Sequence, residues 1–282
     1  MTVAEPFAAL AGSDTAVWGG LAAASFAAGA VNAIAGGGTI IAFPVIAAAL
    51  PADAARLVSA NATSTVGLWP GAVAAAWALR RTRDADREWT AGSFVPSIVG
   101  AASGAALVLA SPTGWFDAVV PWLILTAAVL FAVQPWIVAR PFRSRHRGPS
   151  RVIAGCGQFL VALYGGYFGA GIGILVLALL GSGGVTDIHR ANAAKNILTT
   201  AINGTAAAVF AIVSIAGIPL RPDEGVPWGV SWPHAIVMAC GAVGGGLAGA
   251  LLARRMRPAV VRRMVAIIGF ALAGYYLWRQ YA

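Results

Sequence analysis

The chain has 282 residues, of which 59% are hydrophobic and 10% charged, and its mean hydropathy is +0.78. Water-soluble domains carry about 25% charged residues, so this composition excludes a soluble enzyme, a secreted disulfide scaffold and a disordered chain. The formal net charge of +9 comes from short arginine-rich runs between apolar stretches. Because these runs form no single basic face, they argue against nucleic-acid binding. The sequence predicts an integral membrane protein.

Several stretches without a charged side chain are long enough to cross a bilayer, which takes about 18 to 20 apolar residues. They cover residues 15–52, 57–79, 89–116, 118–139, 152–186, 196–220 and 225–253. Between them lie the basic runs 80–88, 140–151 and 254–263. Under the positive-inside rule these runs face the cytoplasm. We therefore expect a multi-pass protein of the cell membrane.

The first uncharged stretch, residues 15–52, does not fit one straight helix. Such a helix would be about 57 Å long, nearly twice the thickness of the hydrocarbon core, yet the stretch is slightly short for two crossings and a turn. Three consecutive glycines, Gly36 to Gly38, place the break, because glycine has little preference for the helix. Pro44 lies just beyond, in a short apolar piece.

The second half of the chain has the same plan. Glycines gather at 165–173, and the short apolar piece after them ends at 181–184. A shift of 134 residues places Asp53 on Asp187 and Arg56 on Arg190, which favours an internal repeat. The basic runs orient the two copies oppositely, as in many secondary transporters, whose substrate site lies where broken helices meet near the midplane.

We therefore predict an all-α integral membrane protein of about ten segments (eight to ten), arranged as two inverted repeats that each contain a glycine-broken or short helix. The first repeat covers residues 1–139, a basic cytoplasmic linker 140–151, and the second repeat 152–282. A helix follows each break and opens with an aspartate and an arginine, Asp53 and Arg56 or Asp187 and Arg190. A carboxylate there suits a helix N-terminus, so capping with a local ion pair is the favoured role of these charges.

Polar side chains lie farther along both of these helices. They are Asn61, Thr63, Ser64 and Thr65 in the first, and Lys195, Asn196, Thr199, Thr200 and Asn203 in the second. In hydrocarbon such groups need partners or a wet cavity. Lys195 is the only lysine of the chain and lies roughly 12 Å beyond the expected helix start. Either it snorkels to the interface, or its ammonium group faces a cavity and attracts an anion.

The apolar segments contain no aspartate or glutamate. Proton- and sodium-coupled carriers often place a carboxylate in the membrane, whereas a cavity with one cation, several hydroxyls and exposed backbone N–H groups suits a small oxyanion. An interior-negative potential favours outward movement of an anion by about 2.3 kcal/mol per charge per 100 mV. Export therefore needs no coupling ion.

Four segments carry a family resemblance: AGGGTIIAFP at 35–44, SANATST at 59–65, GGYFGAGIGILVLALL at 165–180 and HRANAAKNILTT at 189–200. With these motifs the sequence resembles the sulfite exporter TauE/SafE family of membrane transporters, over essentially the whole chain. It departs from the family pattern at Leu179, where a proline usually follows the glycines, and at Ile172, which interrupts them.

The resemblance implies a transporter, often an exporter, of small sulfur-containing anions such as sulfite or organosulfonates. From the paired broken helices we predict alternating access, and we expect no cofactor. By motif position, one side of its substrate site would be formed by Gly36, Gly37, Gly38, Asn61, Thr63 and Ser64. The other side would be formed by Gly169, Gly171, Gly173, Lys195, Asn196 and Thr199.

Several alternatives stay open. An anion channel could use the same residues, and the substrate could be another small carboxylate or inorganic anion. A membrane-embedded enzyme or assembly factor lacks a set of acid, base and nucleophile, and a metal-ion carrier lacks a cluster of carboxylates, histidines or cysteines. The expected partners are a small anion and the lipid bilayer, with a homodimer as a candidate assembly.

Overall fold

The protein is an all-helical bundle. The computed structural model describes residues 15–52, 55–78, 87–112, 114–143, 151–185, 187–219, 228–252 and 258–281. Within these ranges the chain forms ten α-helices and no strand, and six of the helices are long and apolar enough to cross a membrane. A helix satisfies its own backbone hydrogen bonds, as a chain in hydrocarbon must. The predicted all-α multi-pass membrane fold is confirmed.

The helices follow the predicted segments. The first half contains α2 (Thr15–Ile34), α3 (Thr39–Ala49), α4 (Arg56–Ala78), α5 (Arg87–Ala110) and α6 (Trp115–Arg143). The second half contains α7 (Arg151–Tyr167), α8 (Ile172–Ser182), α9 (Ile188–Ile215), α10 (Trp232–Leu252) and α11 (Pro258–Tyr281). Because α6 continues through Arg143, the first residues of the predicted linker 140–151 are helical, and 144–150 lie outside the described residues.

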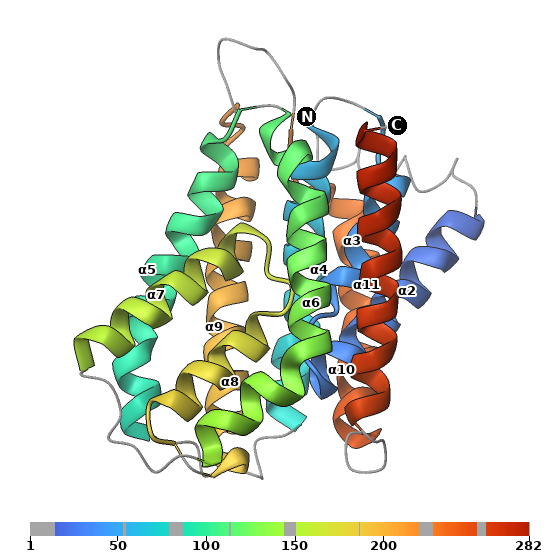
Figure 1. Ribbon diagram of the computed structural model, residues 1–282. Coiled ribbons are helices and arrows are strands. Elements are labelled where there is room, and N and C mark those ends of the chain that lie inside the picture. The colour runs from blue at the N-terminus through green and yellow to red at the C-terminus, as the bar shows by residue number, and fades with distance from the viewer. Residues whose placement is uncertain are drawn as a thin grey trace.

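Both predicted glycine breaks are confirmed. Between α2 and α3, Gly36 and Gly37 have φ angles of +69° and +135°, which L side chains rarely adopt. Between α7 and α8, Gly169 and Gly171 have φ angles of +79° and +78°. The chain turns back there at about mid-height of the bundle (Figure 1). The short helix α8 forms with Leu179 in the place of the usual proline.

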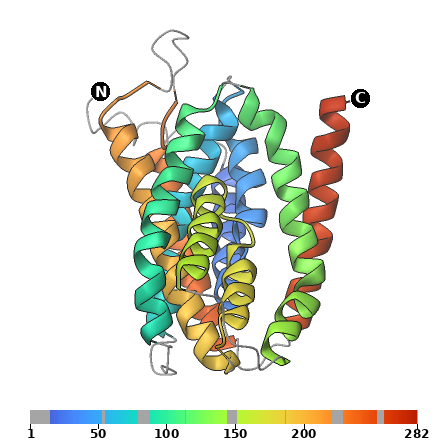
Figure 2. The ribbon, with the colours of Figure 1, turned by 60° about the vertical axis from the view of Figure 1, so that its left-hand side comes forward.

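The two halves of the chain pack through exchanged partners. Helix α10 packs along α2 and α4, and α5 packs in the same way along α7 and α9. Helices α6 and α11 lie side by side and run in opposite directions (Figures 1 and 2). Two related halves packed about a two-fold axis would give this pattern. It supports the inverted repeat, which with its boundaries stays a prediction.

The helix ends that flank the basic runs gather at one end of the bundle. The start of α5, the end of α6 and the start of α11 lie at the lower end in Figure 1. This is the arrangement that a common side for the basic runs requires. Residues 80–86, 144–150 and 254–257 of those runs lie outside the described residues, so their cytoplasmic location stays a prediction.

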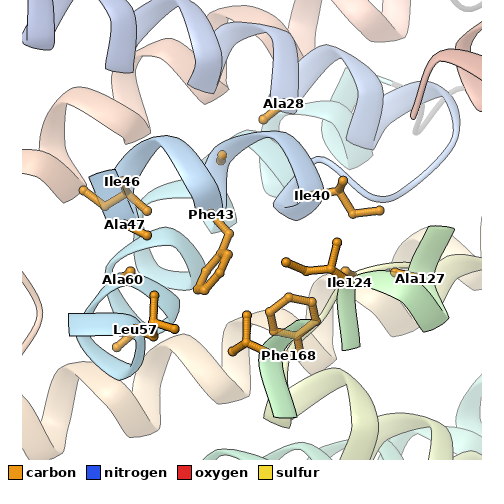
Figure 3. Packing of buried hydrophobic residues seen from close by; sticks show 14 of the residues in the cluster. Ala28, Ile40, Phe43, Ile46, Ala47, Leu57, Ala60, Ile124, Ala127 and Phe168 are labelled. Carbon is orange, nitrogen blue, oxygen red and sulfur yellow. The ribbon is translucent and has the colours of Figure 1, made fainter. Parts of the chain in front are cut away.

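The buried core supports both breaks from one side. Phe43 of α3 and Phe168 of the second break meet edge to face, with ring centroids 5.4 Å apart, and Ile124 and Ala127 of α6 lie next to them (Figure 3). Aromatic pairs of this geometry add about 0.5 to 1.5 kcal/mol beyond the burial of their area. The core therefore joins the two broken helix pairs into one packed unit.

Glycines set the close approach of α2 and α10. A Cβ added to Gly249 would lie 2.6 Å from the Cα of Ala30, and one added to Gly29 would lie 2.9 Å from the Cα of Ala242. Small residues allow helix backbones to touch in a membrane, where packing rather than the hydrophobic effect drives association. Gly29 and Gly249 therefore serve the packing of α2 against α10.

Candidate functional site

A small cavity lies where the two breaks meet. Its volume is about 30 Å³, and its walls come from the first break, the start of α8 and the facing sides of α4 and α9. One water molecule takes roughly 10 to 15 Å³ measured in this way, so the cavity has room for about two waters or one small ion. Seven residues of the predicted site line it: Gly36, Gly37, Gly169, Gly173, Lys195, Asn196 and Thr199.

The first break lies close to the start of α8. A Cβ built on Gly36 would lie 3.8 Å from the Cα of Gly173, which is ordinary van der Waals distance. Gly173 belongs to the first turn of α8, and neither α3 nor α8 has a side chain that caps its N-terminus. The first N–H groups of a helix have no partner within the helix. The N–H groups of Ile40, Ile41 and Ile174 donate to carbonyls of the preceding glycines. Among the described residues, the N–H groups of Ile172 and Gly173 have no such partner, and both residues line the cavity.

Lys195 supplies the charge of the cavity. It lies on α9 and is 5% exposed, and its Cδ lies 3.4 Å from the position of a Cβ on Gly173. Among the described residues, none accepts a hydrogen bond from its ammonium group, and no other charged side chain lines the cavity. This burial favours the cavity-facing role over the snorkelling alternative.

Comparison with known proteins identifies the family of the chain. The model of the family described as Sulfite exporter TauE/SafE matches residues 21–276. The chain belongs to the TauE/SafE sulfite exporter family. No curated protein and no solved structure matches it significantly. Since TauE/SafE proteins are membrane transporters, this chain is a transporter and not an enzyme.

The other residues predicted for the TauE/SafE site lie outside the cavity lining. Gly38 and Gly171 stand at the N-caps of α3 and α8 and so shape the breaks. The Asn61 amide donates a hydrogen bond of 3.0 Å to the carbonyl of Tyr167, and Ser64 donates one of 3.0 Å to the carbonyl of Asn61. The first contact ties α4 to the end of α7, beside the second break, and the second lies within α4. A role for these residues in substrate binding stays a prediction.

Thr63, in the same N-terminal part of α4, holds a connecting segment. The segment 228–231 presents three consecutive N–H groups to three hydroxyl oxygens. Ser59 accepts from the first of them at 3.3 Å, Ser214 from the second at 2.9 Å and Thr63 from the third at 3.0 Å. The segment is thus fixed across α4 and α9. Such a role is invisible in the sequence, because partner and segment are far apart along the chain.

The predicted helix-capping role of the aspartates can be examined at α9, one of the two helices for which it was predicted. The backbone N–H of Arg190 lies 3.4 Å from Oδ1 of Asp187, at the start of α9. This contact agrees with capping. Asp53, the matching residue of the first half, lies outside the described residues.

Three polar residues of the cavity were not assigned to the site from the sequence: Asn32, Thr200 and Asn203. Asn32 accepts a hydrogen bond of 3.2 Å from the N–H of Gly37, so it also shapes the first break. Asn196, Thr199, Thr200 and Asn203 follow one another at helical spacing, and this period predicts a single face. Applying it strictly would have found Thr200 and Asn203.

The part of the chain that the structure describes shows no candidate metal site. It contains no group of three or more histidine, cysteine, aspartate or glutamate side chains that could hold a metal ion. Cys156 and Cys240 are free and exposed, on α7 and α10. The chemistry of the cavity therefore rests on Lys195 and neutral polar groups.

Proposed function

We propose that this protein is a secondary transporter that exports small sulfur-containing anions, sulfite or organosulfonates, across the cell membrane, and that the anion binds in the cavity between the two breaks. The observation that supports the site is the buried ammonium group of Lys195. Removing a charge from water costs several kcal/mol when no partner compensates it. Because no described side chain does so, a bound anion is the natural counter-ion.

Neutral donors complete the proposed site. The Thr199 hydroxyl bonds within its own helix, to the carbonyls of Lys195 at 2.8 Å and of Asn196 at 3.3 Å. Further donors of the lining are the amides of Asn32, Asn196 and Asn203, the Thr200 hydroxyl and the N–H groups of Ile172 and Gly173. Hydrogen bonds to a charged group are worth about 1.5 to 3 kcal/mol each, so a few of them suffice to orient an oxyanion.

The two breaks also support alternating access. They come from different halves of the chain and both line the cavity, the arrangement that inverted-repeat carriers use. A shift of one broken pair relative to the other would open the cavity to one side of the membrane at a time. With the basic runs in the cytoplasm, the membrane potential favours movement of the anion outward.

Flux measurements in proteoliposomes test this proposal. We would compare sulfite, sulfoacetate, sulfate, phosphate and acetate, using the wild type, Lys195→Gln and the matched control Arg190→Gln. Arg190 is an exposed cation on the same helix. We expect saturable flux of a sulfur oxyanion that is lost in Lys195→Gln and retained in Arg190→Gln. Unchanged flux in Lys195→Gln would place the site elsewhere, and flux that does not saturate would indicate the alternative function, an anion channel.

A further inference from the structure

We infer that the cavity selects anions of a single negative charge, such as bisulfite or a sulfonate, over dianions such as sulfate. The inference rests on the proposed function, because it concerns the same site. The charges around the cavity are balanced by a ligand of one negative charge.

The fixed side-chain charge of the cavity is one. Among the described residues that line it, Lys195 alone is charged, and the other polar side chains are amides and hydroxyls. The two acidic residues whose side chains the structure describes do not line it: Asp187 precedes α9 and is exposed, and Asp117 lies in the first turn of α6. A dianion would therefore meet one cation and no second one.

The helix dipoles do not supply the missing charge. A helix N-terminus carries a partial charge of roughly +0.5 and a C-terminus roughly −0.5. At the first break α2 ends at Ile34 and α3 begins at Thr39, and at the second α7 ends at Tyr167 and α8 begins at Ile172. Because opposite ends meet at each break, the two partial charges largely cancel. The free N–H groups then act as directional donors that add no net charge.

Neutrality matters here because the site lies inside a membrane protein. An uncompensated charge within the bilayer is costly. A monoanion beside Lys195 gives a neutral complex, whereas a dianion leaves one negative charge without a partner. The occupied site is therefore most stable, and most easily moved between its two accessible states, with a monoanion.

Methanesulfonate and sulfate make a matched pair of probes. Both have a tetrahedral sulfur that carries oxygen atoms, and a methyl group in the first replaces a charged oxygen in the second. Both keep their charge across the neutral pH range. Binding to purified wild-type protein and competition against sulfite flux would be measured for each. We expect methanesulfonate to bind at least tenfold more tightly than sulfate.

A second cation in the cavity should shift the preference from methanesulfonate towards sulfate. Thr200 also lines the cavity, so Thr200→Lys would add a charge next to the site, and Thr200→Gln is the uncharged control of similar length. We expect the ratio of sulfate affinity to methanesulfonate affinity to rise at least tenfold in Thr200→Lys relative to Thr200→Gln. The comparison of the two probes on the wild type needs no variant, so the inference stays testable even where Thr200→Lys fails to fold.

The outcomes distinguish the location of the site from its preference for monoanions. Sulfate binding as tightly as methanesulfonate, with both lost in Lys195→Gln, would overturn the charge rule and leave the site in place. Binding of neither probe, or binding unchanged in Lys195→Gln, would remove the proposed site and the inference with it. Tighter binding of methanesulfonate that depends on Lys195 would support both.

Discussion

Gly173→Ala tests whether the anion lies against the second break. Gly173 is in the first turn of α8, with its Cα close to Gly36 and to the stem of Lys195. An added Cβ would lie 3.4 Å from the Lys195 Cδ and 3.9 Å from the Gly36 Cα. Both distances are ordinary contacts, so the methyl group fits without displacing the backbone and projects into the cavity.

Opposite effects on stability and on binding are expected. Alanine in place of a helical glycine stabilises by roughly 0.5 to 1 kcal/mol. The methyl group takes up part of a cavity of about 30 Å³ and separates the anion from an N–H donor. Loss of one hydrogen bond to a charged group is worth about 1.5 to 3 kcal/mol, which corresponds to a roughly 10- to 150-fold weaker affinity.

The assay combines thermal unfolding in detergent with anion binding, and the control is Gly92→Ala. Gly92 is on α5, with nothing within 4 Å of an added Cβ, so its substitution should leave binding unchanged. Gly173→Ala should unfold at the same temperature as the wild type or a higher one while binding the anion more weakly. Wild-type affinity in Gly173→Ala would refute an anion position against this turn.

Three further substitutions test the packing around the site. Gly249→Ala places a Cβ 2.6 Å from the backbone of α2. Such overpacking should lower the free energy of unfolding by about 1 to 3 kcal/mol, measured by titration with a denaturing detergent. In the same titration the control Gly92→Ala should change the free energy of unfolding little. Thr63→Val removes the hydroxyl that accepts a hydrogen bond from the segment 228–231. An unsatisfied N–H costs about 1 kcal/mol or more, so the amides of that segment should exchange faster in hydrogen-exchange mass spectrometry. Unchanged exchange would contradict the restraining role of Thr63. Tyr164→Phe removes a hydrogen bond of 2.8 Å to the second break, with an expected loss of about 0.5 to 1.5 kcal/mol and a lower unfolding temperature.

The breaks could be predicted because their signal is local. A stretch too long for one crossing and too short for two needs an interruption, and consecutive glycines such as Gly36 and Gly37 place it. Lys195 could be predicted for a similar reason, since a lone cation deep in an apolar helix requires an environment of its own. Both conclusions depend on residues that are close in sequence.

The rest of the site depends on how the helices rotate against one another. Asn61 and Thr63 have the polar character of site residues, but α4 turns them towards Tyr167 and towards the segment 228–231. Conversely, Asn32 is a single amide among alanines, four residues before the first glycine of the break, and only the fold brings it to the cavity. Polarity identifies such residues, whereas long-range packing decides which of them meet.

The exchange of partners between the two halves has a consequence for biosynthesis. Helix α2 leaves the ribosome well before its glycine-lined partner α10. Until α10 has been inserted into the bilayer, the first broken pair lacks the helix that holds it in place. A nascent chain that ends before Trp232 therefore cannot complete the first half, and two separately synthesised halves should mature only when they are produced together.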